Sequence, residues 1–119
     1  MPVQPPQVFI SYQRSDGDFA REVREHLVAH DVQTWMDQYD IPVGAYWPDA
    51  IDSGLRGSAV VLGIVSPDAV VSRNVKNEWD WALQQGTPLL LLLARPVADI
   101  PHRYVSINFI DATVGHPAI

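Results

Sequence analysis

The sequence lacks cysteine, long apolar runs and an excess of positive charge. It contains no cysteine, so disulfide bonds and thiolate chemistry are excluded. No apolar run approaches the roughly 18 residues that a membrane-spanning helix needs. Its 8 lysine and arginine residues are outnumbered by 14 aspartates and glutamates, and this excess of negative charge argues against a protein that binds a nucleic-acid backbone. We therefore expect a cytoplasmic protein without a nucleic-acid or membrane partner.

Several chemical motifs are also missing. No strand is followed by G-x-G-x-x-G, and no G-x-x-x-x-G-K-[ST] or G-x-S-x-G is present. A phospho-receiver would need carboxylates where Ser11-Tyr12 and Ser66-Pro67 stand. His26 and His30 have the spacing of two metal ligands on one helix, but no third ligand accompanies them, so a solvated pair is favoured over zinc. We expect neither a metal nor a cofactor.

What is present is a regular alternation of short apolar runs and amphipathic segments, in a chain that is 47% hydrophobic and 18% charged. The predicted strands are Val8 to Tyr12, Val32 to Met36, Ala59 to Val65, Leu89 to Ala94 and Val105 to Ile110. The predicted helices run from Ser15-Asp16 to about His30, from Trp47 to Leu55 and from Ser72 to Gly86, and a loop is expected from Asp37 to Gly44.

This alternation predicts an α/β fold. Two strands are apolar throughout, as in a parallel sheet that is covered by helices on both faces. If the strand order is the flavodoxin-like 2-1-3-4-5, the winding reverses between the first and third strands, where ligands bind in such sheets. Residues from Ser11 to Arg14, and from Ser66 onward, then lie at the expected site.

One carboxylate lies on the margin of the third predicted helix. The segment SRNVKNEWDWALQQG begins with a helix-capping serine and ends with a glycine. At about 100° per residue, its buried stripe consists of Val75, Trp79, Ala82 and Leu83. Glu78 lies beside this stripe, half desolvated and still able to reach a ligand. An acid near a helix start also complements the helix dipole, so the wheel by itself leaves a surface role for Glu78 open.

Three stretches carry a resemblance to a known family: VFISYQRSD, then WMDQYDIPVGAYWPDAIDSGLRGS, then VVLGIVSPDAVVSRNVKNEWDWAL. Together they resemble a bacterial TIR (Toll/interleukin receptor) domain from Val8 to about Ile110. The resemblance implies the flavodoxin-like sheet already predicted. We expect residues 1–7 to form a flexible arm and residues 8–119 to form the TIR domain, truncated because the family's final helix is missing.

The resemblance also implies roles for particular residues. Enzymatic members cleave NAD between nicotinamide and ribose, and Glu78 falls on their catalytic glutamate. Gln13 and Arg14 match a pair that lines the nucleotide site, and Tyr39 matches a further lining position. Two positions depart from the pattern, because Asn74 stands where a tryptophan is frequent and Gln13 where some relatives have a second arginine. The expected lining of the NAD site is Ser11, Gln13, Arg14, Trp35, Tyr39, Trp47 and Asn74.

The chemistry suits these residue types. Cleavage of an N-glycosidic bond passes through an oxocarbenium-like ribose, which a carboxylate stabilises. Arg14 is suited to a phosphate, and the aromatic side chains of Trp35, Tyr39 and Trp47 either stack on a base or pack in the core and rim. Water as the nucleophile gives ADP-ribose, whereas the adenine gives a cyclic product. The sequence does not choose between these products.

A second function class is an interaction module. The family's loop corresponds to Asp37 to Ala45, and its Ile41, Pro42 and Gly44 match the family pattern. In that reading the part from Ile41 to Ala45 contacts other TIR domains, and Glu78 is a surface acid. The two readings are compatible, and we expect a TIR-domain NAD glycohydrolase that is activated by self-assembly inside a larger defence or signalling protein. An FMN-binding protein is disfavoured because the turn after the first strand lacks a run of hydroxyl residues.

Overall fold

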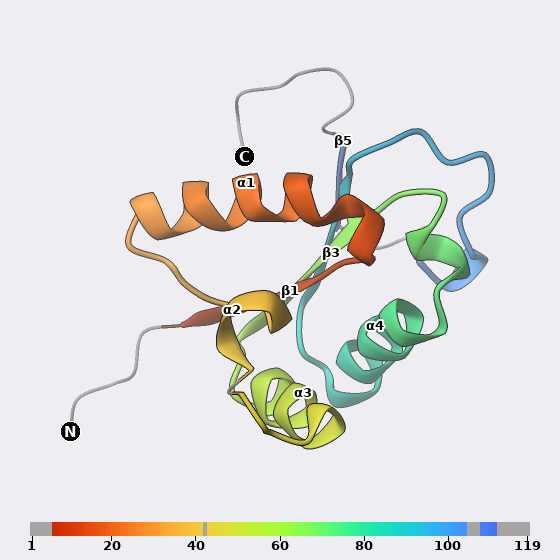
Figure 1. Cartoon of the computed structure of the whole chain (residues 1–119). Coiled ribbons are helices and arrows are strands. Elements are labelled where there is room, and N and C mark those ends of the chain that lie inside the picture. The colour runs from red at the N-terminus through yellow and green to blue at the C-terminus, as the bar shows by residue number, and fades with distance from the viewer. Residues whose placement is uncertain (1–5, 42, 105–107, 112–119) are drawn as a thin grey trace.

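The fold is a five-stranded parallel sheet between two layers of helices (Figure 1). The computed structural model describes residues 6–41, 43–104 and 108–111. The strands lie in the order β2-β1-β3-β4-β5, which confirms the predicted flavodoxin-like α/β topology. They are β1 (Gln7–Ser11), β2 (Gln33–Trp35), β3 (Val60–Val65), β4 (Leu89–Leu93) and β5 (Asn108–Asp111).

The helices are α1 (Gly17–Ala29), α2 (Asp37–Asp40), α3 (Trp47–Arg56) and α4 (Arg73–Gln85), with 3-10 turns η1 (Arg14–Asp16), η2 (Ala69–Val71) and η3 (His102–Tyr104). In Figure 1, α1 lies on one face of the sheet and α3 and α4 lie on the other. Within the described ranges, no helix combines the length and the apolar character that crossing a bilayer requires.

Each face of the sheet has its own core. Alternate residues of a strand point to opposite faces, and β1 shows this directly. Phe9 belongs to the cluster on the side of α3 and α4, whereas Ile10 belongs to the cluster under α1. The same alternation sends Ser11 toward α4 and Tyr12 toward α1. Ser11, the last residue of β1, and Tyr12, which follows it, therefore present polar side chains to the two layers.

The boundaries differ from the predicted ones in a few places. Strand β1 begins at Gln7, and the expected loop after β2 opens with the short helix α2. Two backbone bonds close this turn, from the Tyr39 and Asp40 amides to the Met36 carbonyl oxygen at 2.9 Å, and an Asp40 carboxylate oxygen accepts a further hydrogen bond from the Met36 amide at 2.8 Å. Residues 1–5, which make up most of the predicted arm, lie outside the described residues, as do Pro42, the start of the last predicted strand (residues 105–107) and residues 112–119.

Helix α4 has the ends that its sequence predicts. The Ser72 hydroxyl oxygen accepts a hydrogen bond from the Val75 amide at 3.3 Å, and this bond caps the helix start. The chain leaves the helix through Gly86, whose φ of 73° is left-handed and therefore favours glycine. Both ends of the helix that carries Glu78 are thus fixed by local sequence.

A close contact between β3 and α4 fixes the distance of this helix from the sheet. Trp79 is fully buried, and its ring lies edge-on to Tyr104 with centroids 5.1 Å apart. Its indole lies directly over Gly63, because a Cβ atom at Gly63 would stand 2.5 Å from the Trp79 Nε1 atom and 2.8 Å from Leu91. Only a residue without a side chain allows α4 to pack this closely.

We predict that Gly63→Ala destabilises the fold by about 1–3 kcal/mol, because the added methyl group overpacks the core. Unfolding in urea, followed by far-UV circular dichroism, measures the loss. Gly17→Ala is the matched control, since a Cβ there would meet nothing nearer than 3.6 Å. A Gly63→Ala protein as stable as the wild type would show that α4 adjusts freely over β3.

Candidate functional site

The carboxyl end of β1 brings together residues that are far apart in the sequence. The Ser11 hydroxyl donates a hydrogen bond to the Glu78 Oε1 atom at 2.6 Å. Ser11 is buried, and it lies beside Gly63 in the sheet register, under the start of α4. The structure therefore joins the predicted catalytic residue to the first of the predicted lining residues.

Glu78 is in an unusual electrostatic environment. Burial raises the pKa of its carboxyl group from 4.5 to about 7. The hydrogen bond from Ser11 acts in the opposite direction, and the charge of Asp37 adds to the increase. A carboxyl group that gains and loses its proton near neutral pH is typical of functional sites rather than of helix surfaces.

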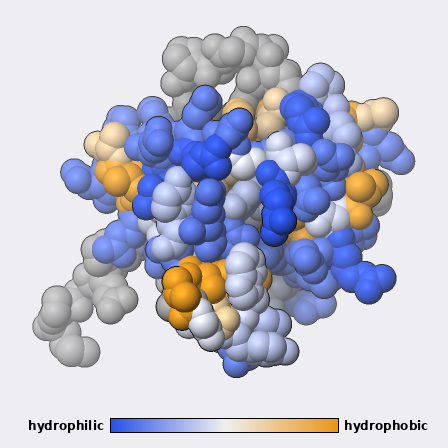
Figure 2. Space-filling view, in the orientation of Figure 1, coloured by the Kyte–Doolittle hydropathy of each residue, from blue (hydrophilic) through white to orange (hydrophobic). Residues whose placement is uncertain are grey.

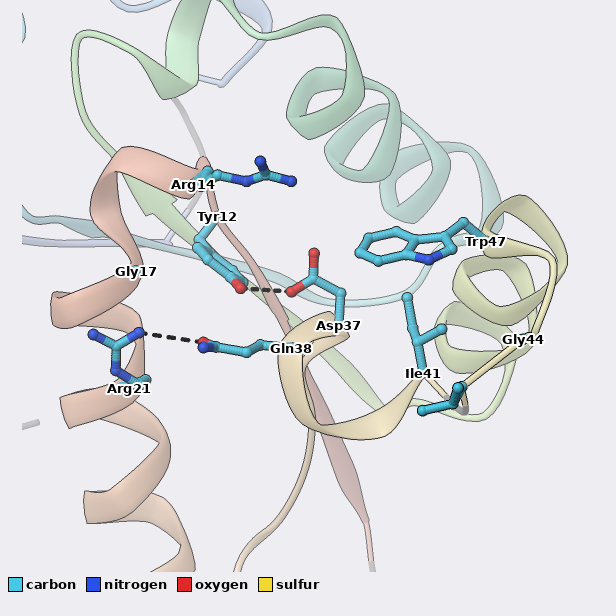
Figure 3. A pocket seen from close by; sticks show the side chains of 10 residues that line it. Tyr12, Arg14, Gly17, Arg21, Asp37, Gln38, Ile41, Gly44 and Trp47 are labelled. Atoms are coloured by element: carbon cyan, nitrogen blue, oxygen red, sulfur yellow. Dashed lines mark hydrogen bonds between the residues drawn. The ribbon is translucent and has the colours of Figure 1, made fainter.

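A second hydrogen-bonded carboxylate lies at the same edge of the sheet. The Tyr12 hydroxyl donates to the Asp37 Oδ1 atom at 2.5 Å (Figure 3). Burial raises the pKa of Tyr12, and the bond to Asp37 raises it further, so the hydroxyl keeps its proton and remains a donor. Asp37 is the first residue of α2, and the bond therefore ties the segment after β2 to the end of β1.

A cavity of about 520 Å³ opens beside this pair. In Figure 3 the side chains of Arg14, Asp37 and Trp47 point toward one shared space. Its lining residues are Tyr12, Arg14, Gly17, Arg21, Asp37, Gln38, Ile41, Val43, Gly44 and Trp47. The cavity combines two guanidinium groups, one carboxylate and one indole, a set that suits a ligand with both a phosphate and a ring.

A second cavity of about 450 Å³ contains Glu78. It lies between α3 and α4, and its lining residues are Trp47, Pro48, Ile51, Asp52, Leu55, Asn74, Asn77, Glu78 and Trp81. Trp47 lines both cavities and is 51% exposed. Of the predicted lining residues, Asn74 thus shares a cavity with Glu78, Arg14 lines the other cavity, and Trp47 lines both.

Three predicted lining residues are placed elsewhere. Trp35 stacks on Phe9 with ring centroids 4.8 Å apart and covers Gly54, so its ring takes the core-packing role that the sequence had left open. The Tyr39 ring lies against the Arg24 guanidinium at 4.0 Å, on the side of α1. Gln13 precedes η1, and its carbonyl oxygen accepts a hydrogen bond from the Asp16 amide at 2.8 Å. None of the three lines either cavity.

Sequence reasoning missed the pairing of Tyr12 with Asp37. Both residues directly follow or end a predicted strand, and the carboxyl ends of β1 and β2 meet at one edge of the sheet. That placement was the available signal. The sequence did not identify the two residues as hydrogen-bond partners, because tertiary packing and not a sequence motif brings Tyr12 to Asp37.

A second polar cluster, formed by Asp16, Ser66, Asp68 and Arg95, connects the loops that follow β1, β3 and β4. Asp16 is buried, where the Ser66 hydroxyl donates to it at 2.5 Å and Arg95 approaches it at 2.9 Å. Arg95 also reaches Asp68 at 3.1 Å. These contacts join the loops after β1, β3 and β4, and they support the edge on which the site is built.

The segment between α2 and α3 exposes apolar side chains. Figure 2 shows an orange patch over this part of the molecule. Val43 is fully exposed, and Tyr46 is 69% exposed. Gly44 has a φ of 82°, a left-handed conformation that favours glycine. The predicted interaction loop, residues 37–45, thus presents apolar surface next to the first cavity.

Comparisons with known proteins agree with this architecture. A family model described as "TIR domain" matches residues 8–118. The curated protein 2' cyclic ADP-D-ribose synthase AbTIR of Acinetobacter baumannii (strain 1295743) is 34% identical over 73 residues, which cover 60% of this chain and 25% of that protein. The matched part thus spans about a quarter of the length of this relative.

Solved structures share the fold. The TIR domain of the Toll-related receptor TRR-2 from Hydra magnipapillata superposes with a TM-score of 0.80 at 18% identity, covering 87% of this chain and 82% of that one. The TIR domains of the activated Roq1 resistosome, which recognises the pathogen effector XopQ, give a TM-score of 0.65 at 15% identity, covering 74% and 57%.

The raised pKa of Glu78 predicts a pH-dependent stability. Between about pH 4.5 and pH 7 the folded chain holds the proton that the unfolded chain releases, so stability falls as the pH rises through this window. We expect Glu78→Gln to be more stable than the wild type at about pH 8, on the order of 1–3 kcal/mol, and to lose this advantage near pH 4.5.

Urea unfolding at several pH values measures the difference. Glu25→Gln, on the exposed surface of α1, is the matched control for the loss of a carboxylate. An advantage of Glu78→Gln that stays constant from pH 4.5 to pH 8 would contradict the assignment.

Proposed function

Because the chain belongs to the TIR domain family, we propose that it cleaves NAD between nicotinamide and ribose, with Glu78 as the catalytic carboxylate. The observation that carries the proposal is the half-buried Glu78, bonded to Ser11 at 2.6 Å and opening into a cavity at the edge where β1 and β3 end. The similarity to a bacterial 2' cyclic ADP-D-ribose synthase supports it.

The reaction needs negative charge more than it needs an acid. The nicotinamide ring is positively charged before the bond breaks, and the bonding electron pair moves to it as the ring leaves as a neutral molecule. Positive charge then develops on the ribose, where an ionised Glu78 stabilises it. The approach of the cationic ring also favours the ionised form of Glu78, which burial disfavours in the empty site.

The two cavities suit the two parts of the substrate. The Glu78 cavity, with Trp47 and Trp81 in its wall, would take the nicotinamide and its ribose. The adjoining cavity would take the diphosphate, with Arg14 as a bidentate partner. Addition of water to the ribose, with loss of a proton, gives ADP-ribose. An attack from within the same molecule gives a cyclic ADP-ribose, so the two products distinguish the two routes.

We place the site in an assembly of TIR domains. The Glu78 edge is open, and water there weakens the effect of a carboxylate on developing charge. The exposed Val43 in the loop of residues 37–45, together with Tyr46 directly after it, offers an apolar contact by which this segment would cover the site of a second copy. A cytoplasmic chain that serves as the effector part of a larger defence or signalling protein accords with this activity.

A second function is favoured by the same exposed loop. A TIR domain that only assembles with other TIR domains would use residues 37–45 and would have no need for Glu78. The short bond between Ser11 and Glu78 favours the enzyme, because an acid that serves only solubility does not require a buried partner.

We predict that Glu78→Gln lowers NAD cleavage by roughly 10²-fold or more, the effect of removing one electrostatic stabiliser. Separation of nicotinamide and ribosyl products by chromatography gives the rate and identifies the product as linear or cyclic. Glu25→Gln is again the control and keeps the wild-type rate. Unchanged turnover in a well-folded Glu78→Gln protein would remove Glu78 from the catalytic role.

We also predict that NAD cleavage per mole of protein rises when the protein concentration is increased roughly hundredfold, because a shared site forms only in assembled chains. Gly44→Val should reduce both light scattering by assemblies and the concentration-dependent part of the rate. Its effect on the core is small, since a Cβ at Gly44 meets nothing within 4 Å and the strain stays in an exposed loop. A flat, readily detected rate would mean that one chain builds the whole site.

A further inference from the structure

Ser11 is buried at the end of β1, on the side of the sheet that α4 covers. It is 1% exposed and lines neither of the two cavities, although the family resemblance had predicted that it lines the NAD site. A side chain without access to a cavity cannot contact a ligand bound there. Its hydroxyl instead donates to the Glu78 Oε1 atom at 2.6 Å. Any part that Ser11 takes in the reaction therefore passes through Glu78.

We propose that Ser11 is a positioning residue, whose hydroxyl holds one oxygen of the Glu78 carboxylate so that the other oxygen is directed into the cavity between α3 and α4. The meaning of this inference for catalysis rests on the proposed function, in which Glu78 is the catalytic group. The geometry itself can be tested without turnover.

The two oxygens of Glu78 are in different surroundings. In the part of the chain that the structure describes, Oε1 accepts the bond from Ser11, whereas Oε2 has no hydrogen-bond partner. Oε2 is not one of the two side-chain atoms that are both buried and unpaired among these residues. It therefore reaches the accessible surface, which at this point is the cavity that Glu78 shares with Asn74 and Trp81. One oxygen is bound by the protein and the other is free for a ligand.

The position of Ser11 is fixed by the packing of the sheet against α4. Ser11 pairs with Gly63 of β3 in the parallel register, and the Trp79 indole packs on Gly63. Glutamate is among the side chains with the most rotamer freedom, whereas serine has a short side chain with one χ angle. A buried hydroxyl on a central strand is therefore suited to select one orientation of the longer carboxylate.

A fixed second oxygen is what the proposed reaction requires. Positive charge develops on the ribose as nicotinamide leaves, and a carboxylate stabilises this charge best when it is already oriented toward it. Burial raises the pKa of Glu78, and the bond from Ser11 opposes this increase because it stabilises the ionised form. Ser11 thus supports both the direction and the charge of the catalytic group.

The charged groups around Glu78 do not provide this contact. The other charged residues that line the two cavities, and those near Glu78 on α4, are Arg14, Arg21, Asp37, Asp52, Arg73, Lys76 and Asp80. Among the described residues, none of them is hydrogen-bonded or ion-paired to Glu78, and Asp52 and Asp80 are instead paired with Arg56 and Arg103 at 2.8 Å. All of them are retained when Ser11 is changed, so a difference between Ser11 variants reports the loss of the hydroxyl.

The chain contains three glutamates, Glu22, Glu25 and Glu78, which makes a direct measurement simple. Protein labelled with ¹³C at the glutamate carboxyl carbon gives three resonances, and their shifts against pH report each titration. The Glu78→Gln protein assigns the Glu78 resonance. Glu22 and Glu25, both exposed on α1, serve as internal references in every sample.

We expect the Glu78 midpoint, near pH 7 in the wild type, to rise by about 0.5–1 unit in Ser11→Ala, because the ionised carboxylate loses its donor. Ser66→Ala is the matched control. Ser66 is also fully buried at the end of a neighbouring strand, and it donates to a different carboxylate, that of Asp16, at 2.5 Å. Its loss removes a comparable buried bond and should leave the Glu78 midpoint unchanged.

The kinetics of NAD cleavage separate positioning from binding. Because Ser11 does not reach a cavity, Ser11→Ala should lower kcat by roughly 10–100-fold and leave KM near the wild-type value. The acid limb of the kcat profile should move to higher pH together with the Glu78 midpoint. Ser53→Ala, an exposed serine on α3 that lines neither cavity, is the control for activity and should keep the wild-type rate.

A Glu78 midpoint that is the same in wild type and Ser11→Ala would overturn the proposal, as would an equal shift in Ser66→Ala. A higher KM with an unchanged kcat would instead make Ser11 a residue that binds NAD. If Ser11→Ala does not fold by circular dichroism, Ser11→Cys takes its place, since a thiol has a similar shape and is only a weak donor. The titration is made without NAD, so a protein that shows the shift and does not cleave NAD would refute the proposed function alone.

Discussion

The contact between Trp79 and Gly63 is the constraint on which the rest of the site depends. A side chain at Gly63 would stand 2.5 Å from the indole, so this one position determines how closely α4 approaches β3. Glu78 precedes Trp79 on the helix, and Ser11 lies beside Gly63 in the sheet. Because the Trp79 indole packs on Gly63, the Glu78 carboxylate lies within hydrogen-bond distance of the Ser11 hydroxyl. A core packing contact of this kind sets the position of a functional group to within the tolerance of a hydrogen bond.

The buried carboxyl group of Glu78 lowers the stability of the fold at neutral pH, because its ionised form is costly there. Burial makes the ionised form of Glu78 costly, and Asp37 increases that cost while Ser11 offsets part of it. A neutral side chain of the same shape would stabilise the fold better at neutral pH. An arrangement of this kind is expected where a carboxylate is required by a ligand that brings its own positive charge, because the ligand then supplies the compensation that the empty protein lacks.

The proposed catalytic function and the proposed assembly function both involve the segment from α2 to α3. Its beginning is held against α1 and β1 through Asp37, Gln38 and Tyr39, whereas Val43 and Tyr46 further along are exposed. One end is thus connected to the carboxylates and the other to the surface. An apolar surface next to an open polar cavity is suited to a neighbour that also excludes water from that cavity. Assembly and catalysis would then be two uses of the same segment.

Local sequence determined most of the secondary structure and the fold class. Apolar runs and the strand–helix alternation were sufficient for a parallel α/β sheet, and the serine and glycine were sufficient for the ends of α4, because these signals act within a few residues. The order β2-β1-β3-β4-β5 was expected from the resemblance to TIR domains, since strand order depends on contacts between distant segments. Tertiary structure decided the partners. It placed Trp35 on Phe9, turned Tyr39 toward Arg24, formed α2 inside an expected loop and joined Tyr12 to Asp37. Those outcomes depend on which side chains of distant segments fill the same space, and a periodic pattern along one segment carries no information about its neighbour.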